Sequence, residues 1–112
     1  MITSIEIARL AGYLEGEGCF GTQRYNRPNK PYTYPRIQVS ATDRDVVEWA
    51  AGLLGARVKG PYGPKSPNRK AYYVCTATGA AAVGWMMTLY SMMGERRKGQ
   101  IRKALSEWRN KI

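Results

Sequence analysis

Apolar positions switch between a helical period and a strand period along the chain. Thr3-Ser4-Ile5-Glu6 predicts a capping box that opens a helix, with Glu6 reaching back to the cap residue. Apolar residues then recur at helical spacing as far as about Glu15, at Ile7, Leu10, Ala11 and Leu14. Gly16 and Gly18 follow and are expected to end the helix.

Two strands and a turn are predicted next. Residues 19–25 and 32–40 favour an antiparallel pair, because the segment between them holds two prolines and two asparagines. Ile37 and Val39 indicate the core side of the second strand. Pro35 indicates an edge or bulge position, since proline cannot donate to a ladder.

The second half repeats the order of helix and two strands, then adds two helices. Thr42-Asp43-Arg44-Asp45 predicts another capping box, opening a helix that Gly55 ends. Strands are predicted over 56–62 and 70–78, and helices over 79–93 and 95–110. The predicted order is α-β-β-α-β-β-α-α, an α+β fold in one domain over residues 1–112.

The distribution of charge along the chain narrows the possible functions of the protein. The formal net charge is +10, and the segments 18–42 and 49–94 hold nine bases and no acid. A one-signed field of this kind favours phosphate binding, whereas a merely solubilising surface mixes both signs. No apolar run is long enough to span a membrane, so an intracellular, cytoplasmic protein is expected, including one in an organelle or a phage-infected cell.

Residue types exclude several chemistries. The chain has no His, which removes Ser-His-Asp triads and most zinc sites, and two cysteines are too few for a disulfide framework. Catalysis therefore depends on carboxylates, lysines, tyrosines or a bound metal.

One short motif carries both a packing signal and chemistry. The residues Leu10-Ala11-Gly12-Tyr13-Leu14-Glu15-Gly16-Glu17-Gly18 place two glycines four apart on one helix face, where a second helix can approach closely. Glu15 and Glu17 stand at the helix end, where a carboxylate opposes the helix dipole and is a poor choice for stability alone.

This motif resembles that of the LAGLIDADG homing endonucleases, and the order of elements extends the resemblance over almost the whole chain. It implies a site-specific endonuclease that makes a staggered double-strand break with Mg²⁺. Glu17 matches the metal-binding acid, with the Gly16 backbone beside it, and Glu15 is expected to be more structural. The family's second-strand Gln falls at Ala41, and its late-helix Lys falls in Arg96-Arg97-Lys98, where Lys98 is favoured.

A single motif implies a homodimer on near-palindromic duplex DNA, since cutting two strands needs two acids. The expected dimer interface comprises Ile7, Leu10, Ala11, Gly12, Tyr13, Glu15 and Gly16.

The strands are expected to read the DNA major groove with every second side chain. The expected readers are Gly21, Gln23, Tyr25, Tyr34, Arg36, Gln38, Ser40, Arg57, Lys59, Tyr72, Val74 and Thr76. Bases in or beside loops are expected to contact phosphate, and these are Arg24, Arg27, Lys30, Lys65, Arg69 and Lys70.

Two alternatives stay open. A catalytically silent DNA-binding protein or an RNA-splicing maturase on the same scaffold would keep the glycines and the bases. A small basic ribosome-associated or architectural protein would make the motif a coincidence.

Overall fold

The computed structural model describes residues 2–25, 32–63 and 70–109, without the side chains of Tyr25, Tyr32 and Arg109. Its elements are α1 (Ser4–Glu17), β1 (Gly18–Tyr25), β2 (Tyr32–Ala41), α2 (Arg44–Leu54), β3 (Val58–Tyr62), β4 (Tyr72–Thr78), α3 (Gly79–Leu89), the short 3-10 helix η1 (Tyr90–Met92) and α4 (Glu95–Arg109). The predicted α+β class and the predicted order of elements are confirmed. No described helix is long and apolar enough to cross a membrane.

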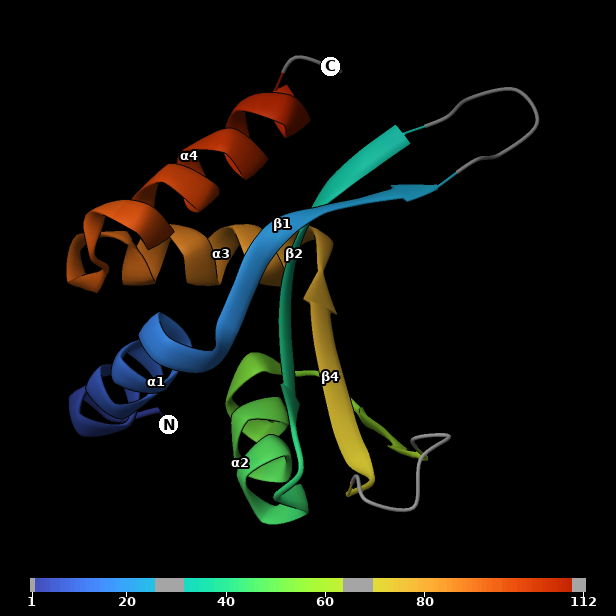
Figure 1. Ribbon diagram of the computed structural model, residues 1–112. Coiled ribbons are helices and arrows are strands. Elements are labelled where there is room, and N and C mark those ends of the chain that lie inside the picture. The colour runs from blue at the N-terminus through green and yellow to red at the C-terminus, as the bar shows by residue number, and fades with distance from the viewer. Residues whose placement is uncertain (1, 26–31, 64–69, 110–112) are drawn as a thin grey trace.

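The four strands form one antiparallel sheet in the order β1-β2-β4-β3. The helices pack on one face of this curved sheet, and the other carries none; we call the latter the open face (Figure 1). The core lies between sheet and helices and includes Leu10 and Leu14 of α1, Ile37 and Val39 of β2, and Ile101 of α4.

Strand parity decides which side chains reach the open face. In β2, Pro35, Ile37 and Val39 are buried against the helices, so Arg36 and Gln38 point the other way. β2 is a central strand of the sheet, but its pairing with β4 ends at Arg36↔Thr78. Pro35 lies one residue beyond that pair, so at this position β2 is paired with β1 alone. The predicted edge position of Pro35 is therefore correct locally.

The ends of α1 are set by two different caps. At the start, the predicted capping box is present, with the Glu6 N–H donating to Thr3 Oγ1 at 3.1 Å. The Thr3 backbone N–H, and then its hydroxyl, donate to Glu6 and lower the pKa of that carboxyl. At the other end the helix continues to Glu17, two residues beyond the expected end, and the Gly18 N–H bonds to the Leu14 carbonyl.

The second predicted capping box is wrong. Asp43, not Thr42, is the N-cap of α2, and its side chain makes no cap hydrogen bond. The predicted end of this helix is correct, because Gly55 adopts a left-handed φ of 73° that disfavours other residues.

Strand β3 differs from its predicted form. It begins at Val58, so Arg57 precedes the strand, and its register with β4 shifts between Lys59 and Tyr62. Lys59 pairs with Val74 and Tyr62 with Tyr72, so the expected alternation of side chains does not continue along β3 beyond Lys59.

Candidate carboxylate site and nucleic-acid interface

Glu17 is the exposed last residue of α1, where the helix passes directly into β1. The register Gly18↔Val39 sets it beside the end of β2, near Ser40. Burial raises the pKa of the Tyr13 hydroxyl and the charge of Glu17 raises it further, so the carboxylate lies within electrostatic range of Tyr13. The position therefore offers an accessible carboxylate at the rim of the open face.

The donor chemistry of this position suits a hard cation, since Mg²⁺ prefers carboxylate oxygens and retains several waters. Within the described part of the chain, no group of three acidic or cysteine side chains lies together. A Mg²⁺ ion at Glu17 would complete its coordination with water and with oxygens from a substrate or a second protomer.

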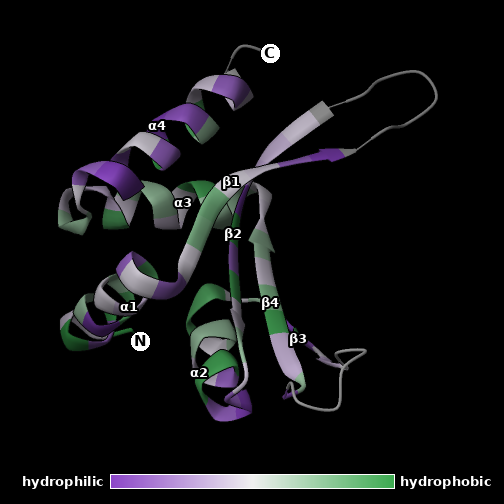
Figure 2. Ribbon diagram, viewed as in Figure 1, coloured by the Kyte–Doolittle hydropathy of each residue, from purple (hydrophilic) through white to green (hydrophobic). Residues whose placement is uncertain are grey.

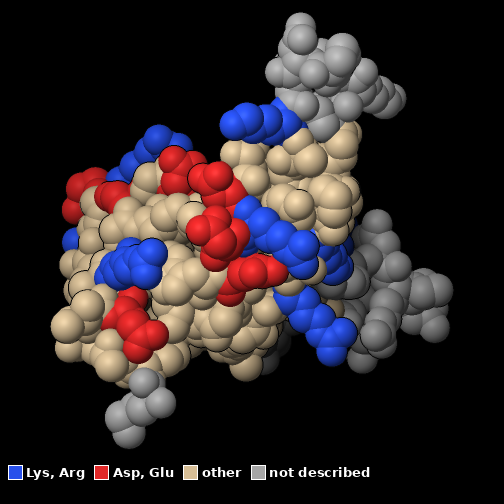
Figure 3. All heavy atoms as spheres, turned by 90° about the horizontal axis from the view of Figure 1, so that it is seen from below, with Lys and Arg blue, Asp and Glu red and all other residues tan. Residues whose placement is uncertain are grey.

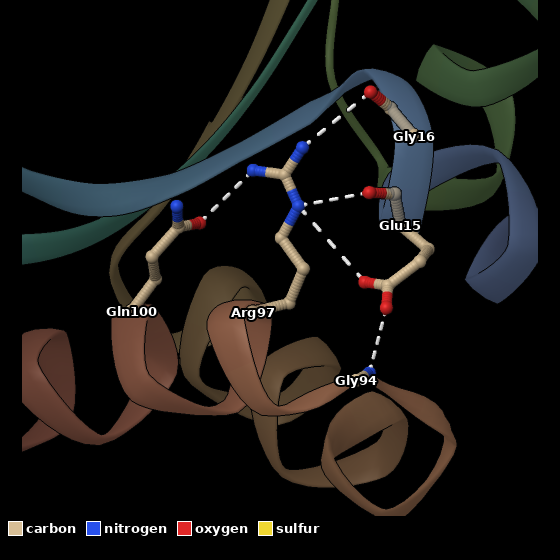
Figure 4. Close-up of polar contacts among 5 residues, drawn as sticks. All are labelled: Glu15, Gly16, Gly94, Arg97 and Gln100. Carbon is tan, nitrogen blue, oxygen red and sulfur yellow. Dashed lines mark hydrogen bonds and ion pairs between the residues drawn. The ribbon is translucent and has the colours of Figure 1, made fainter.

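Two helix ends cap each other beside Glu17 (Figure 4). The Arg97 side chain of α4 is buried and donates from Nε to the Glu15 carbonyl at 2.9 Å and from Nη2 to the Gly16 carbonyl at 3.5 Å. In return, Glu15 Oε1 accepts the Gly94 N–H at 2.7 Å, at the start of α4. Each helix end receives the charge that its dipole favours, a cation at the C-terminus of α1 and an anion at the N-terminus of α4.

A Cβ at Gly94 would displace the end of the Glu15 side chain, so the glycine lets this carboxylate approach the start of α4. Arg97 is oriented in turn by Gln100, whose side-chain oxygen accepts from Nη1 at 3.0 Å. This network fixes the C-terminal turn of α1, and with it the backbone from which Glu17 projects.

These contacts bear on two expectations about the site. Lys98 faces Glu95, at 3.9 Å, and the Tyr90 ring, at 5.5 Å, so of the three clustered bases it is Arg97 that reaches α1. The Gly16 carbonyl faces a guanidinium, which repels a divalent cation and makes this oxygen a poorer metal ligand than expected. The sequence contained one indication of this role for Arg97. It precedes Ile101 by four residues, a spacing that places both side chains on the same, buried face of α4.

Replacing Arg97 with methionine is expected to lower the free energy of unfolding by roughly 2 kcal/mol, because two helix-end carbonyls lose their donor. The 4.0 Å ion pair with the half-exposed Glu15 side chain contributes little to this value. Urea unfolding measures the loss, and Arg96→Met, at an exposed site of the same helix, should change stability by less than about 0.5 kcal/mol. Equal effects of the two substitutions would show that the contacts of Arg97 do not stabilise the fold.

Strand parity and pairing place most of the expected DNA readers on the open face. These are Gly21 and Gln23 of β1, Tyr34, Arg36, Gln38 and Ser40 of β2, Lys59 of β3, and Tyr72, Val74 and Thr76 of β4. Arg24 lies on the same face of β1 as the buried Phe20, but its side chain is exposed. Arg57 and Lys70 are exposed beside the ends of strands. Arg27, Lys30, Lys65 and Arg69, and the side chain of Tyr25, lie outside the described residues.

Arg36 is the cation at the centre of this face. It lies opposite Gly21 in the register, and a Cβ on Gly21 would be in ordinary van der Waals contact with its Nη2 at 3.7 Å, so the guanidinium lies over Gly21. Its Nε is buried and has no hydrogen-bond partner among the described residues. The guanidinium of Arg36 therefore lies over β1 with one donor that no described residue satisfies.

Ala41 does not occupy a site position. Its side chain packs against the core, whereas Gln38, paired with Cys19, and the exposed Ser40 lie on the open face beside Glu17. Gln38 and Ser40 are therefore polar side chains on the open face at the end of β2 where α1 passes into β1.

The charge distribution sets the open face apart. No strand contains an acid, whereas Arg24, Arg36 and Lys59 are on strands. Acids and bases lie next to one another on the end of the molecule seen in Figure 3. Three of the acids, Asp43, Asp45 and Glu48, are exposed at the start of α2. The sheet therefore presents an acid-free surface that suits a polyanion.

One side of α1 has no packing partner among the described residues of the protomer. Its exposed residues Ile5, Ala8, Gly12 and Gly16 recur at helical spacing, and nothing lies within 4 Å of a Cβ built on either glycine. Ile5 is 79% exposed, which is unusual for an isoleucine.

The other residues expected at the dimer interface are used within the protomer. Leu10 and Ala11 are buried in the core, Ile7 packs against it, and Tyr13 packs edge-to-face on Trp49 of α2. Glu15 bonds to α4. The expected interface is therefore wrong for Leu10 and Ala11, and the open side of α1 centres on Gly12.

Comparison with solved structures identifies the fold. The chain is similar to the homing endonuclease I-CvuI bound to a DNA target in 2 mM Mg, with a TM-score of 0.65 and 18% identity over 88% of this chain and 62% of that one. It is also similar to the intron-encoded I-CeuI bound to DNA, with a TM-score of 0.65 and 15% identity over 91% of this chain and 53% of that one. A third similar structure is the archaeal intron-encoded I-Vdi141I bound to DNA, with a TM-score of 0.64 and 16% identity over 87% of this chain and 63% of that one.

This chain thus has the LAGLIDADG homing-endonuclease fold, and the fold that the motif's resemblance implied is confirmed. It spans less than two thirds of the length of each of these three chains. No protein-family model and no curated protein matches the sequence.

Proposed function

We propose that the protein is a homodimeric, metal-dependent endonuclease that binds duplex DNA on the open face and cuts both strands. The observation that carries this proposal is the position of Glu17, an exposed carboxylate on a fixed helix end at the rim of an acid-free sheet. I-CvuI, I-CeuI and I-Vdi141I, which share the fold, are bound to DNA in their structures.

The dimer follows from the open side of α1. Gly12 and Gly16 allow a second α1 helix to approach at backbone distance, and a two-fold axis there would bring two Glu17 carboxylates together. These carboxylates and the phosphate oxygens of the substrate would hold Mg²⁺, which when bound activates water and stabilises the leaving oxygen.

The residues of this chain have distinct parts in the reaction. Glu17 supplies a metal ligand at the scissile phosphate, and Arg97 and Glu15 act as positioning residues by fixing the end of α1. Gln38 and Ser40 lie where they can hold water or phosphate oxygen. Cleavage of a plasmid library carrying candidate sites, in magnesium but not in calcium, tests the enzymatic part of the proposal.

Specificity would come from the open face. The guanidinium of Arg36 suits the O6 and N7 acceptors of guanine, and the amides of Gln23 and Gln38 suit adenine. A two-fold dimer would read the same half-site twice, which favours a near-palindromic target.

Duplex binding is expected to depend strongly on salt. If about six of the bases meet phosphate, log affinity should fall against log salt with a slope of about −5. Fluorescence anisotropy of a labelled duplex in calcium, between about 50 and 200 mM salt, measures this slope without cleavage. A slope near zero would remove nucleic acid as the partner.

A further inference from the structure

A groove between α3 and α4 lies outside the proposed DNA-cleaving machinery. It measures about 300 Å³ and is lined by Met86, Met87, Tyr90, Ile101, Arg102 and Leu105. Met87 is 68% exposed and the nearby Met92 is 43% exposed. Figure 2 shows the apolar ribbon of α3 beside the largely hydrophilic α4, and residues 79–94 contain no charged side chain.

Two cations border this apolar floor on the α4 side. Arg102 donates from Nη1 to the Tyr90 hydroxyl at 2.6 Å, and its guanidinium carbon lies 6.0 Å from the centre of the Tyr90 ring. Lys98, one turn earlier, has its Nζ 5.5 Å from the same ring centre. Among the described residues, the acid that contacts this pair is Glu95, at 3.9 Å from Lys98 with an 86% exposed side chain. The border of the groove is therefore positively charged and weakly compensated.

The chemistry of the groove disfavours nucleic acid. The Tyr90 ring and hydroxyl are already in contact with two cations, so the aromatic ring is poorly placed to stack on a base. A sugar–phosphate backbone would leave Met87 and Leu105 without apolar contact. The groove also lies on the helix-covered side of the sheet, away from the open face (Figure 1).

We propose that the α3–α4 groove binds an amphipathic helix of a partner protein, apolar on one face and acidic along its edge. Apolar side chains of that helix would fill the space over Met86, Met87 and Leu105, where flexible methionines adapt to varied shapes. Its carboxylates would pair with Lys98 and Arg102, which lie four residues apart on one side of α4. This activity goes beyond DNA cleavage and leaves the open face free.

The probe is a fluorescein-labelled 16-residue helix with leucines on one face and glutamates elsewhere, followed by anisotropy with the full chain. Met87→Gln should weaken binding by about tenfold, because it removes an exposed apolar contact without adding charge. Arg102→Gln should weaken binding by about fivefold. Lys103→Gln, which removes an exposed base from the other side of α4, should change the affinity by less than about twofold and serves as the matched control. Circular dichroism confirms that each variant is folded.

Several results would overturn the proposal. The first is that the peptide does not bind at about 1 mM. The second is that Met87→Gln binds the peptide as tightly as the wild type. The third is that Arg102→Gln and Lys103→Gln weaken peptide binding equally. Displacement of the peptide by excess duplex DNA would assign it to the open face. Displacement by single-stranded RNA that depends on Met87 would assign the groove to nucleic acid, and vesicles of anionic phospholipid bound through Met87 would assign it to a membrane.

Discussion

Replacing Glu17 with glutamine is expected to abolish DNA cleavage while leaving duplex affinity unchanged or slightly higher. The amide keeps the size of the side chain but ligates a hard cation poorly, so the cleavage rate should fall about 1000-fold or more, equivalent to roughly 4 kcal/mol of lost transition-state stabilisation. Binding should not suffer, because one negative charge per chain leaves the edge of the DNA surface. Single-turnover cleavage and anisotropy in calcium measure the two effects separately.

Glu15→Gln is the matched control, two residues earlier in the same helix. Its carboxylate accepts the Gly94 N–H and faces Arg97, so this change should lower the free energy of unfolding by about 1 kcal/mol and leave much of the cleavage activity. Wild-type cutting by Glu17→Gln in magnesium would remove Glu17 from the site and direct attention to Glu15 or to other chemistry.

Replacing Gly12 with leucine is expected to convert the proposed dimer to a monomer. Gly12 lies at the centre of the exposed side of α1, and a leucine there would separate two helices whose contact depends on close backbones. The folded protomer should persist, since a Cβ at position 12 meets nothing within 4 Å inside the chain and leucine favours helices. Sedimentation velocity measures the oligomeric state.

Gly52→Leu is the control for this substitution, because Gly52 is also an exposed helical glycine with open space at its Cβ but lies on α2. It should leave the dimer intact. A dimer that survives Gly12→Leu, or is lost equally in Gly52→Leu, would contradict the assignment of the interface to α1.

Local sequence patterns were sufficient to predict most of the fold. The Thr3–Glu6 capping box, the left-handed Gly55 and the alternation of Ile37 and Val39 each act within a few residues, so their consequences could be predicted. The end of α1 was placed too early because Gly16 was read as a stop, whereas Arg97, 81 residues away, binds the Glu15 and Gly16 carbonyls and holds the turn. The bulge in β3 likewise depends on its pairing with β4.

The site was predictable only in part, because some of its features depend on contacts between segments that are distant in the sequence. The exposed position of Glu17 and the open side at Gly12 follow from the helical period of the motif. The choice among Arg96, Arg97 and Lys98 depends on which base meets α1 in three dimensions, and the pattern around Ile101 was too short to decide it. The face on which Ala41 lies could not be predicted either, because one residue of strand parity moves a side chain from the open face to the core.

The most direct test of metal-dependent cleavage by this chain is the mapping of cut ends. A plasmid library with randomised inserts is incubated with the wild type or Glu17→Gln in magnesium, and the broken ends are sequenced. The wild type should produce staggered double-strand breaks at sites with two-fold related halves, and Glu17→Gln should produce none. Duplex binding by the wild type without any such breaks would contradict metal-dependent cleavage, and would identify a DNA-binding protein that keeps the scaffold without the activity.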